Sequence, residues 1–213
     1  AGITIPAQVT EVKARPGEYH VAISGTKSGE VTLTVSVGGI TLDNKPRLTL
    51  LADSRTPQMT DLAISQSPVQ AGDTVSYSLK VVDTNNNPLE GMTVSWQPAA
   101  NLVYDNPRQT NLSSQTNTQG MAEISLNLLN VGTFVFKASL DGKQYQDMPT
   151  LTVTPAPIDV QKSTFVTSVA QTKIGGEATL TVTLLDKYDN PISGKKVNIE
   201  LVNKLDGVKV KTV

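Results

Sequence analysis

Asp83-Thr-Asn85-Asn-Asn87 is the stretch of this sequence that most resembles a site for chemistry, because it places an oxygen-bearing side chain at every second position. Alternate oxygen ligands are typical of the start of a calcium-binding loop. Such a loop needs glycine at its sixth position and a bidentate glutamate at its twelfth, where this sequence has Pro88 and Val94. The segment therefore favours an Asx-type turn, in which Asp and Asn side chains bond nearby backbone groups.

A weak calcium site at a joint between units is an alternative that the sequence leaves open. No spacing singles out its ligands, and the candidates are Asp53, Asp61, Asp159 and Asp189.

Catalysis has little support in the residue types. The single histidine, His20, falls on the wet face of a predicted strand between Tyr19 and Val21, which favours a surface role. Acidic residues occur singly in turns, so no two carboxylates are predicted to share a pocket. No glycine-rich phosphate loop precedes a helix. The sequence predicts no catalytic residue, no cofactor and no bound metal, and hence no enzyme.

The composition limits the partners. A net charge of −1 over 213 residues gives no field that attracts nucleic acid or an anionic membrane. The lysines near Lys195 and Lys196 lack interleaved aromatic residues, so they favour a solvated strand face. No apolar run approaches the roughly 20 residues that span a bilayer, so this segment is predicted to lie outside the membrane. Without cysteine, its core must hold by packing alone.

The turn at Asp83 lies between two predicted strands. Val75, Tyr77, Leu79 and Val81 alternate with polar residues, which is the pattern of a strand with one buried face. The same period of two recurs along the chain without a convincing helical period. It predicts strands near residues 19–23, 31–37, 48–50, 62–64, 75–81, 94–96, 102–104, 122–128, 134–140, 151–153, 178–184 and 197–201.

The chain repeats itself at a spacing of 103 residues. Asp83, Asn87, Pro88 and Gly91 recur without a gap as Asp186, Asn190, Pro191 and Gly194. A separate set, Gly17, Gly29, Gly39 and Pro46, recurs at the same spacing as Gly120, Gly132, Gly142 and Pro149. Two segments that share one period indicate a tandem array whose unit has the length of an ordinary domain.

The predicted fold is all-β: tandem immunoglobulin-like β-sandwiches arranged as an elongated rod. About seven short antiparallel strands per roughly 100 residues are typical of this sandwich, and Trp96 takes the place of its buried third-strand tryptophan. The expected segments are 1–53, the C-terminal half of one repeat; 54–155, a complete repeat; and 156–213, the N-terminal half of the next. Pro57, Pro155 and Pro157 are predicted to stiffen the linkers.

The motif from Asp83 to Val94, its copy from Asp186 to Val197, and Thr116-Asn-Thr-Gln-Gly120-Met-Ala122 resemble the bacterial immunoglobulin-like (group 1) repeats of the intimin and invasin family. Members of that family are inverse autotransporter adhesins, whose outer-membrane barrel anchors a string of such repeats. The resemblance implies a cell-surface stalk that carries a binding tip. It implies a host-cell protein or glycan as partner of other parts of the full protein, with adjacent repeats as neighbours.

Other functions stay open at this stage. One alternative is that the repeats themselves bind a host receptor, a glycan or neighbouring copies, with the polar stretch Asn101 to Gln115 as the candidate surface. A carbohydrate-binding module would need a row of exposed aromatics, for which Tyr104 and Tyr145 are the only loop candidates. The two terminal halves are complementary, so copies of the chain joined head to tail would complete a repeat.

Overall fold

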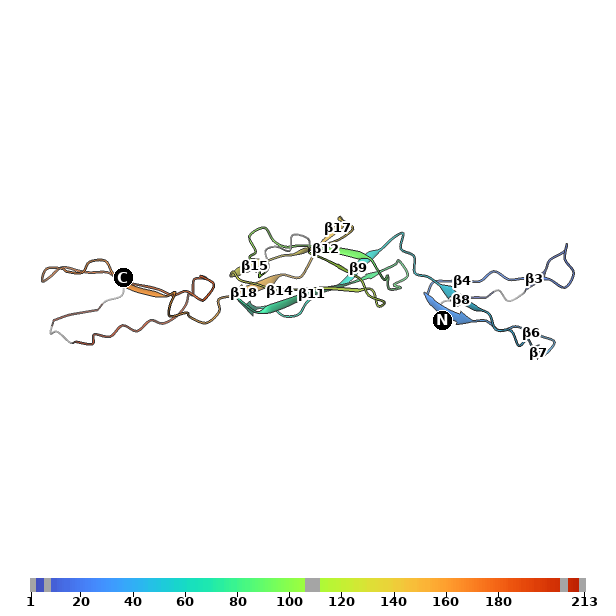
Figure 1. Cartoon of the computed structure of the whole chain (residues 1–213), viewed down its shortest axis with the longest axis horizontal. Coiled ribbons are helices and arrows are strands. Elements are labelled where there is room, and N and C mark those ends of the chain that lie inside the picture. Colours follow the sequence, from blue (N-terminus) through green and yellow to red (C-terminus); the bar gives the residue numbers. More distant parts are fainter. Residues whose placement is uncertain (1–2, 6–8, 106–111, 204–206, 211–213) are drawn as a thin grey trace. The chain divides into compact units, whose positions relative to one another are not determined.

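The structure is a computed structural model that describes residues 3–5, 9–105, 112–203 and 207–210. All of its regular secondary structure is β-strand (Figure 1), which confirms the predicted all-β class. The chain divides into two units, Ala1–Thr154 and Pro155–Val213, which are described in turn. Among the described residues, no helix has the length and apolar character needed to cross a membrane.

Strands β9 to β18, residues 58–154, form the central sandwich. One antiparallel sheet has the order β14-β11-β9, with β14 at Met121–Asn127, β11 at Thr74–Val82 and β9 at Gln58–Ile64. A second has the order β13-β12-β16-β17, with bounds Ser113–Gln115, Thr93–Gln97, Lys137–Leu140 and Lys143–Asp147. A third has the order β10-β18-β15, with bounds Val69–Gln70, Leu151–Thr154 and Gly132–Phe134.

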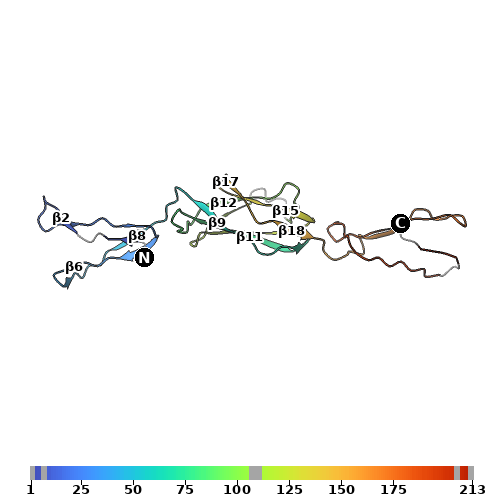
Figure 2. The ribbon, with the colours of Figure 1, turned by 180° about the vertical axis from the view of Figure 1, so that it is seen from behind.

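The core lies between β11 and the strands on the opposite side of the sandwich. The two views place β11 on one side, and β12 and β17 on the other (Figures 1 and 2). Every second residue of β11 points inward, so Val75, Tyr77, Leu79 and Val81 are fully buried, as the alternation predicts. The Tyr77 ring lies 4.3 Å from the ring of Phe136, and this contact joins the two layers.

The segment predicted as one strand over 134–140 is divided between two sheets. β15 pairs with β18, whereas β16 pairs with β12 and β17, and the chain changes sheet around Val135 and Phe136. Phe134, Phe136, Ala138 and Leu140 all remain buried across the break. Alternation therefore identifies the inward face correctly, but it does not show which neighbour each half of the segment pairs with.

Among its described residues, the first segment (1–53) contains four two-stranded antiparallel sheets. They pair β1 (Ile3–Thr4) with β4 (Ser24–Gly25), β2 (Thr10–Glu11) with β3 (Tyr19–His20), β5 (Gly29–Thr32) with β8 (Arg47–Leu50), and β6 (Ser36–Val37) with β7 (Ile40–Thr41). The continuous strands predicted near 19–23 and 31–37 are thus each interrupted. Exposed apolar side chains such as Val37 and Ile40 show that this segment has a thin core.

The second unit has one regular sheet among its described residues, in which β19 (Thr164–Thr167) pairs with β20 (Leu180–Thr183). The strand predicted near 197–201 does not form, and the strand predicted near 178–184 is shortened to β20. Leu180, Val197 and Leu201 stay exposed, because no second layer from the described residues of this unit packs on them. The expected inward face is therefore present in sequence but not buried.

Backbone geometry repeats at the same spacing as the sequence. Residues 103 apart share positive φ values: 86° and 75° at Gly17 and Gly120, 142° and 150° at Gly29 and Gly132, 94° and 85° at Gly72 and Gly175, 74° and 71° at Gly91 and Gly194, and 62° and 67° at Asn86 and Asp189. Isolated bridges Val82–Pro88 and Leu185–Pro191 are copies of each other. The two Asn-Pro turns therefore occupy the same place in their repeats.

Candidate functional site

The two motif segments fold against each other next to the linker, residues 53–57, which connects the first segment to β9. Together they form what we call the Asp83 corner, residues 83–92 with 116–121. Gly91 N donates to Thr116 O at 2.8 Å, and Thr116 N donates to Met92 O at 3.0 Å. The Thr116 hydroxyl is buried, where it donates to Leu89 O and accepts from Met92 N. A buried hydroxyl that satisfies two backbone groups holds the turn and the second segment together.

The Asp83 carboxylate is the centre of this corner and accepts four hydrogen bonds. Its Oδ1 accepts from Asn85 N at 2.8 Å and Asn87 N at 2.9 Å, which makes the predicted Asx-type turn. Its Oδ2 accepts from Asn87 Nδ2 at 2.8 Å and from the backbone N of Asp53 at 3.0 Å. Asp53 belongs to the linker, so the carboxylate ties the linker to the central sandwich.

The charge of this buried carboxylate is set by two opposing effects. Burial by itself raises the pKa of the Asp83 carboxyl, since it disfavours the charged form. The hydrogen bonds from Asn87, Asp53 and Asn85 favour the charged form and outweigh burial, so the pKa falls from 3.8 to about 2. Asp83 is therefore ionised at neutral pH, and its four donors are all amides.

The second unit contains the same arrangement. Asp186 Oδ1 accepts from Tyr188 N at 2.8 Å and Asn190 N at 2.9 Å, and its Oδ2 accepts from Asn190 Nδ2 at 2.9 Å and Ala156 N at 2.9 Å. Burial by itself raises the pKa of Asp186, but the same kinds of hydrogen bond lower it by more, so the pKa falls below its ordinary value. Ala156 lies 103 positions after Asp53, so each copy of the motif binds the amide at the same position of its own linker.

The proline and glycine positions of the motif shape the turn. Pro88 and Pro191 form the bridges with Val82 and Leu185, and Gly91 and Gly194 adopt positive φ in open surroundings. Gly120 is constrained more tightly, because a Cβ there would lie 2.5 Å from Val81 O and 3.2 Å from Pro88 Cβ. Only glycine fits at position 120 without displacing the Asp83 corner.

The remaining predicted residues lie outside the corner. Trp96 is buried in β12, where its Nε1 donates to Ser114 Oγ at 2.9 Å. Pro57 directly precedes β9, and Pro155 and Pro157 flank Ala156, whose amide Asp186 binds. Pro57 and Pro155 are half-buried, whereas Pro157 is exposed.

The candidate calcium ligands are not brought together. Asp53 pairs with Arg55, whose side-chain hydrogen bond is the main reason that the pKa of Asp53 falls to about 2. Asp189 pairs with Lys162, and Asp159 caps the amide of Gln161. In the part of the chain that the structure describes, no three His, Cys, Asp or Glu residues lie close enough to hold a metal.

His20 and the polar stretch give no reactive constellation. The His20 ring is exposed and its Nε2 lies 2.7 Å from Glu18 Oε1. Of the stretch Asn101 to Gln115, residues 106–111 lie outside the described residues. The strand predicted near 102–104 is reduced to an isolated bridge between Tyr104 and Leu128, and the regular strand of this stretch is β13. Tyr145 is exposed on β17.

Sequence reasoning missed the linker amides. Positions 53 and 156 carry Asp and Ala, so no shared side chain marks them, and only the backbone is bound. Thr116 was part of a recognised motif, and its role follows from its buried hydroxyl. The 103-residue spacing was the one signal that would have paired the two linker positions.

Comparison with known proteins gives three kinds of similarity. Residues 60–154 match the bacterial Ig-like domain (group 1) family. The inverse autotransporter adhesin YeeJ of Escherichia coli (strain K12) is 27% identical over 186 residues, which cover 85% of this chain but 8% of YeeJ.

Two solved structures are similar to this chain over most of its length. FdeC, an Escherichia coli adhesin, gives a TM-score of 0.59 at 18% identity, covering 91% of this chain and 64% of that one. Yersinia pseudotuberculosis InvD gives 0.54 at 19% identity, covering 90% and 59%. At these identities the likeness shows the fold.

Proposed function

We propose that this chain is a non-enzymatic stalk segment of a bacterial surface adhesin, because residues 60–154 match the bacterial Ig-like domain (group 1) family. In this role it extends a binding tip from the outer face of the outer membrane. The tip, and the host protein or glycan that it binds, belong to other parts of the full protein. The similarity to the adhesin YeeJ over 85% of this chain supports the proposal.

The observation that carries the proposal is the repeated attachment of the linker. Asp83 and Asp186 bind the amides of Asp53 and Ala156 with the same geometry, so each linker is held against the repeat that follows it. A short, hydrogen-bonded linker suits a spacer, because it removes free chain between successive domains. We propose that 1–53, 54–155 and 156–213 are a C-terminal half-repeat, a complete repeat and an N-terminal half-repeat.

A spacer is distinguished from a binder by two measurements on the same protein. Beads coated with residues 1–213 should adhere to epithelial cells, and to each other, no more than beads coated with albumin. Extra copies of residues 54–155, inserted between a surface anchor and a biotin tag, should increase the reach of the tag with each copy. Adherence above the albumin level would reject the spacer role and assign binding to the repeats.

A further inference from the structure

The Asn87 side chain makes three hydrogen bonds in two directions. Its Nδ2 donates to Asp83 Oδ2 at 2.8 Å within the Asp83 corner, and to Thr26 O at 2.9 Å in the first segment. Its Oδ1 accepts from Ser28 N at 2.9 Å, also in the first segment. Both amide protons and the carbonyl oxygen of this buried side chain are thus used.

Asp83 fixes the orientation of this amide. An ionised carboxylate only accepts hydrogen bonds, so the Asn87 atom that faces Oδ2 must be the nitrogen. The carbonyl oxygen then faces the Ser28 amide, and the second amide proton faces Thr26 O. The carboxylate that holds the linker therefore also prepares Asn87 to bind the first segment, which makes Asp83 a positioning residue.

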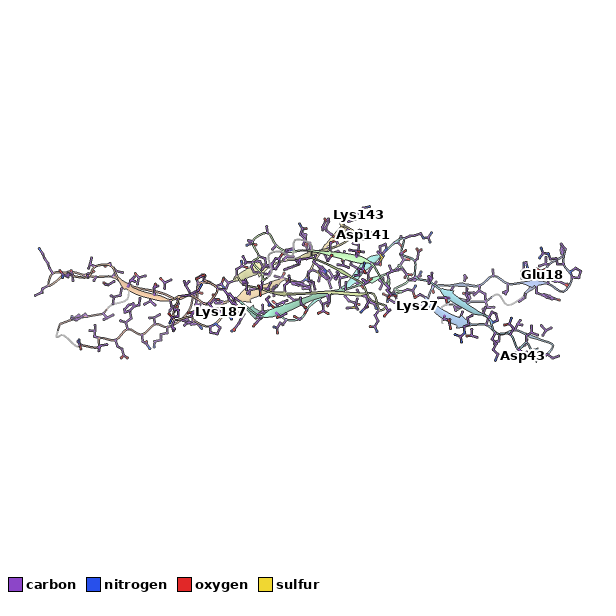
Figure 3. The ribbon with its side chains drawn as sticks, in the orientation of Figure 1. Glu18, Lys27, Asp43, Asp141, Lys143 and Lys187 are labelled. Carbon is purple, nitrogen blue, oxygen red and sulfur yellow. The ribbon has the colours of Figure 1, made fainter. Side chains whose placement is uncertain are left out.

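The groups that Asn87 binds in the first segment belong to the backbone. Thr26 O and Ser28 N flank Lys27 in the turn between β4 and β5, and an amide side chain complements them as a neighbouring peptide group would. The Nζ of Lys27, which is labelled in Figure 3, donates to Asn85 O at 2.9 Å. That acceptor is also a backbone group.

We propose that Asn87 is a recognition site for the neighbouring repeat. Its side chain binds the main chain of the Thr26–Ser28 turn and fixes the joint, and this binding does not depend on the side chains of the turn. Such a site accepts any turn of the same backbone shape, so repeats of different sequence can follow one another. The inference rests on the tandem arrangement, and it holds or fails independently of the adhesin role.

The experiment measures the width of the distance distribution across the joint. Cysteines at Val37→Cys and Tyr145→Cys, both exposed sites, carry spin labels in the full 213-residue protein, which has no cysteine of its own. The unmodified joint should give a narrow distribution by double electron–electron resonance. Asn87→Ala should broaden it at least twofold, and should speed hydrogen exchange of the Ser28 amide at least tenfold.

Two variants of the first segment change no residue of the Asp83 corner and separate backbone from side-chain recognition. The triple change Thr26→Leu, Lys27→Asn and Ser28→Val introduces the residues found 103 positions later, and should leave the distribution narrow. Ser28→Pro removes the N–H that donates to Asn87 Oδ1, and it should broaden the distance distribution as Asn87→Ala does.

Trp96 fluorescence would reveal whether Asn87→Ala unfolds the corner. The two first-segment variants test the proposal even in that case. A narrow distribution in Ser28→Pro would overturn the proposal, because the joint would then hold without this bond. Broadening in the triple variant equal to that in Ser28→Pro would also overturn it, because the site would then read side chains.

Discussion

The Tyr77 ring lies 4.3 Å from the Phe136 ring, and the buried Tyr77 hydroxyl has no hydrogen-bond partner within the described residues. Burial raises the pKa of Tyr77 above its ordinary value, since the site disfavours the phenolate. An unpaired hydroxyl also costs desolvation free energy, whereas the ring itself packs well.

Tyr77→Phe is therefore expected to stabilise the central sandwich by about 1 kcal/mol. Urea unfolding followed by the fluorescence of Trp96, the single tryptophan, reports this sandwich. The exposed Tyr145→Phe is the control and should change the free energy of unfolding by less than about 0.5 kcal/mol. Destabilisation by Tyr77→Phe would show that the hydroxyl has a partner in solution.

Gly120→Ala should destabilise the same transition by roughly 3 kcal/mol, because it combines a positive φ of 75° with a Cβ 2.5 Å from Val81 O. Gly91→Ala is a matched control, with a φ of 74° and no atom within 4 Å of its Cβ. It should cost about 1 kcal/mol, the backbone strain alone. Equal losses in the two variants would argue against close packing at Gly120.

Asp83→Asn should destabilise the central sandwich by at least about 2 kcal/mol, because the new amide group faces donors that need an acceptor. Asp147→Asn is the control, since Asp147 is exposed and only pairs with Lys137 at 3.7 Å. It should change stability by less than about 0.5 kcal/mol. Similar effects of the two variants would contradict the central place given to Asp83.

The effect of Asp83→Asn should also depend on pH. The Asp83 pKa is about 2 in the folded protein against an ordinary 3.8, so its carboxylate contributes stability fully above pH 3.8. That contribution is lost as pH falls through 3.8 toward 2. The stability difference between the original protein and Asp83→Asn, measured from pH 7 to pH 2, should therefore shrink below about pH 4. A constant difference would count against ionisation of Asp83.

Trp96→Ala should cost about 3 to 5 kcal/mol, since it empties a buried site in β12. Circular dichroism must follow this variant, because it removes the only tryptophan. Ser114→Ala removes only the acceptor of the indole N–H, and about 1 kcal/mol is expected. A loss below 1 kcal/mol in Trp96→Ala would mean that the indole does not support the core.

The parts of the fold that depend on side-chain type were predictable. Alternation identified the buried face of β11, and the spacing of Asp, Asn, Pro and Gly identified two equivalent turns. Strand pairing was harder, because a period of two defines faces and not neighbours. Hence the break between β15 and β16 and the two-residue β10 were not foreseen.

In the candidate site, too, the side chains were predictable from the sequence and their backbone partners were not. Asp83 and Asn87 were marked by their residue types, but their partners at Asp53, Thr26 and Ser28 contribute only backbone atoms. Backbone groups leave no trace in residue identity, so the sequence alone indicated a turn and not an attachment between segments.

The short strand β10 runs parallel to β18, with Val69 opposite Val153 and Gln70 opposite Thr154. Ala71 N donates to Thr154 O at 2.8 Å, and Thr154 Oγ1 donates to Val69 O at 3.0 Å. The chain enters the sandwich through β9, continues into β10, and leaves the sandwich through β18. Because β10 and β18 are parallel, a pull on the N-terminal end of β10 against the C-terminal end of β18 would shear the pair lengthwise and load its hydrogen bonds together.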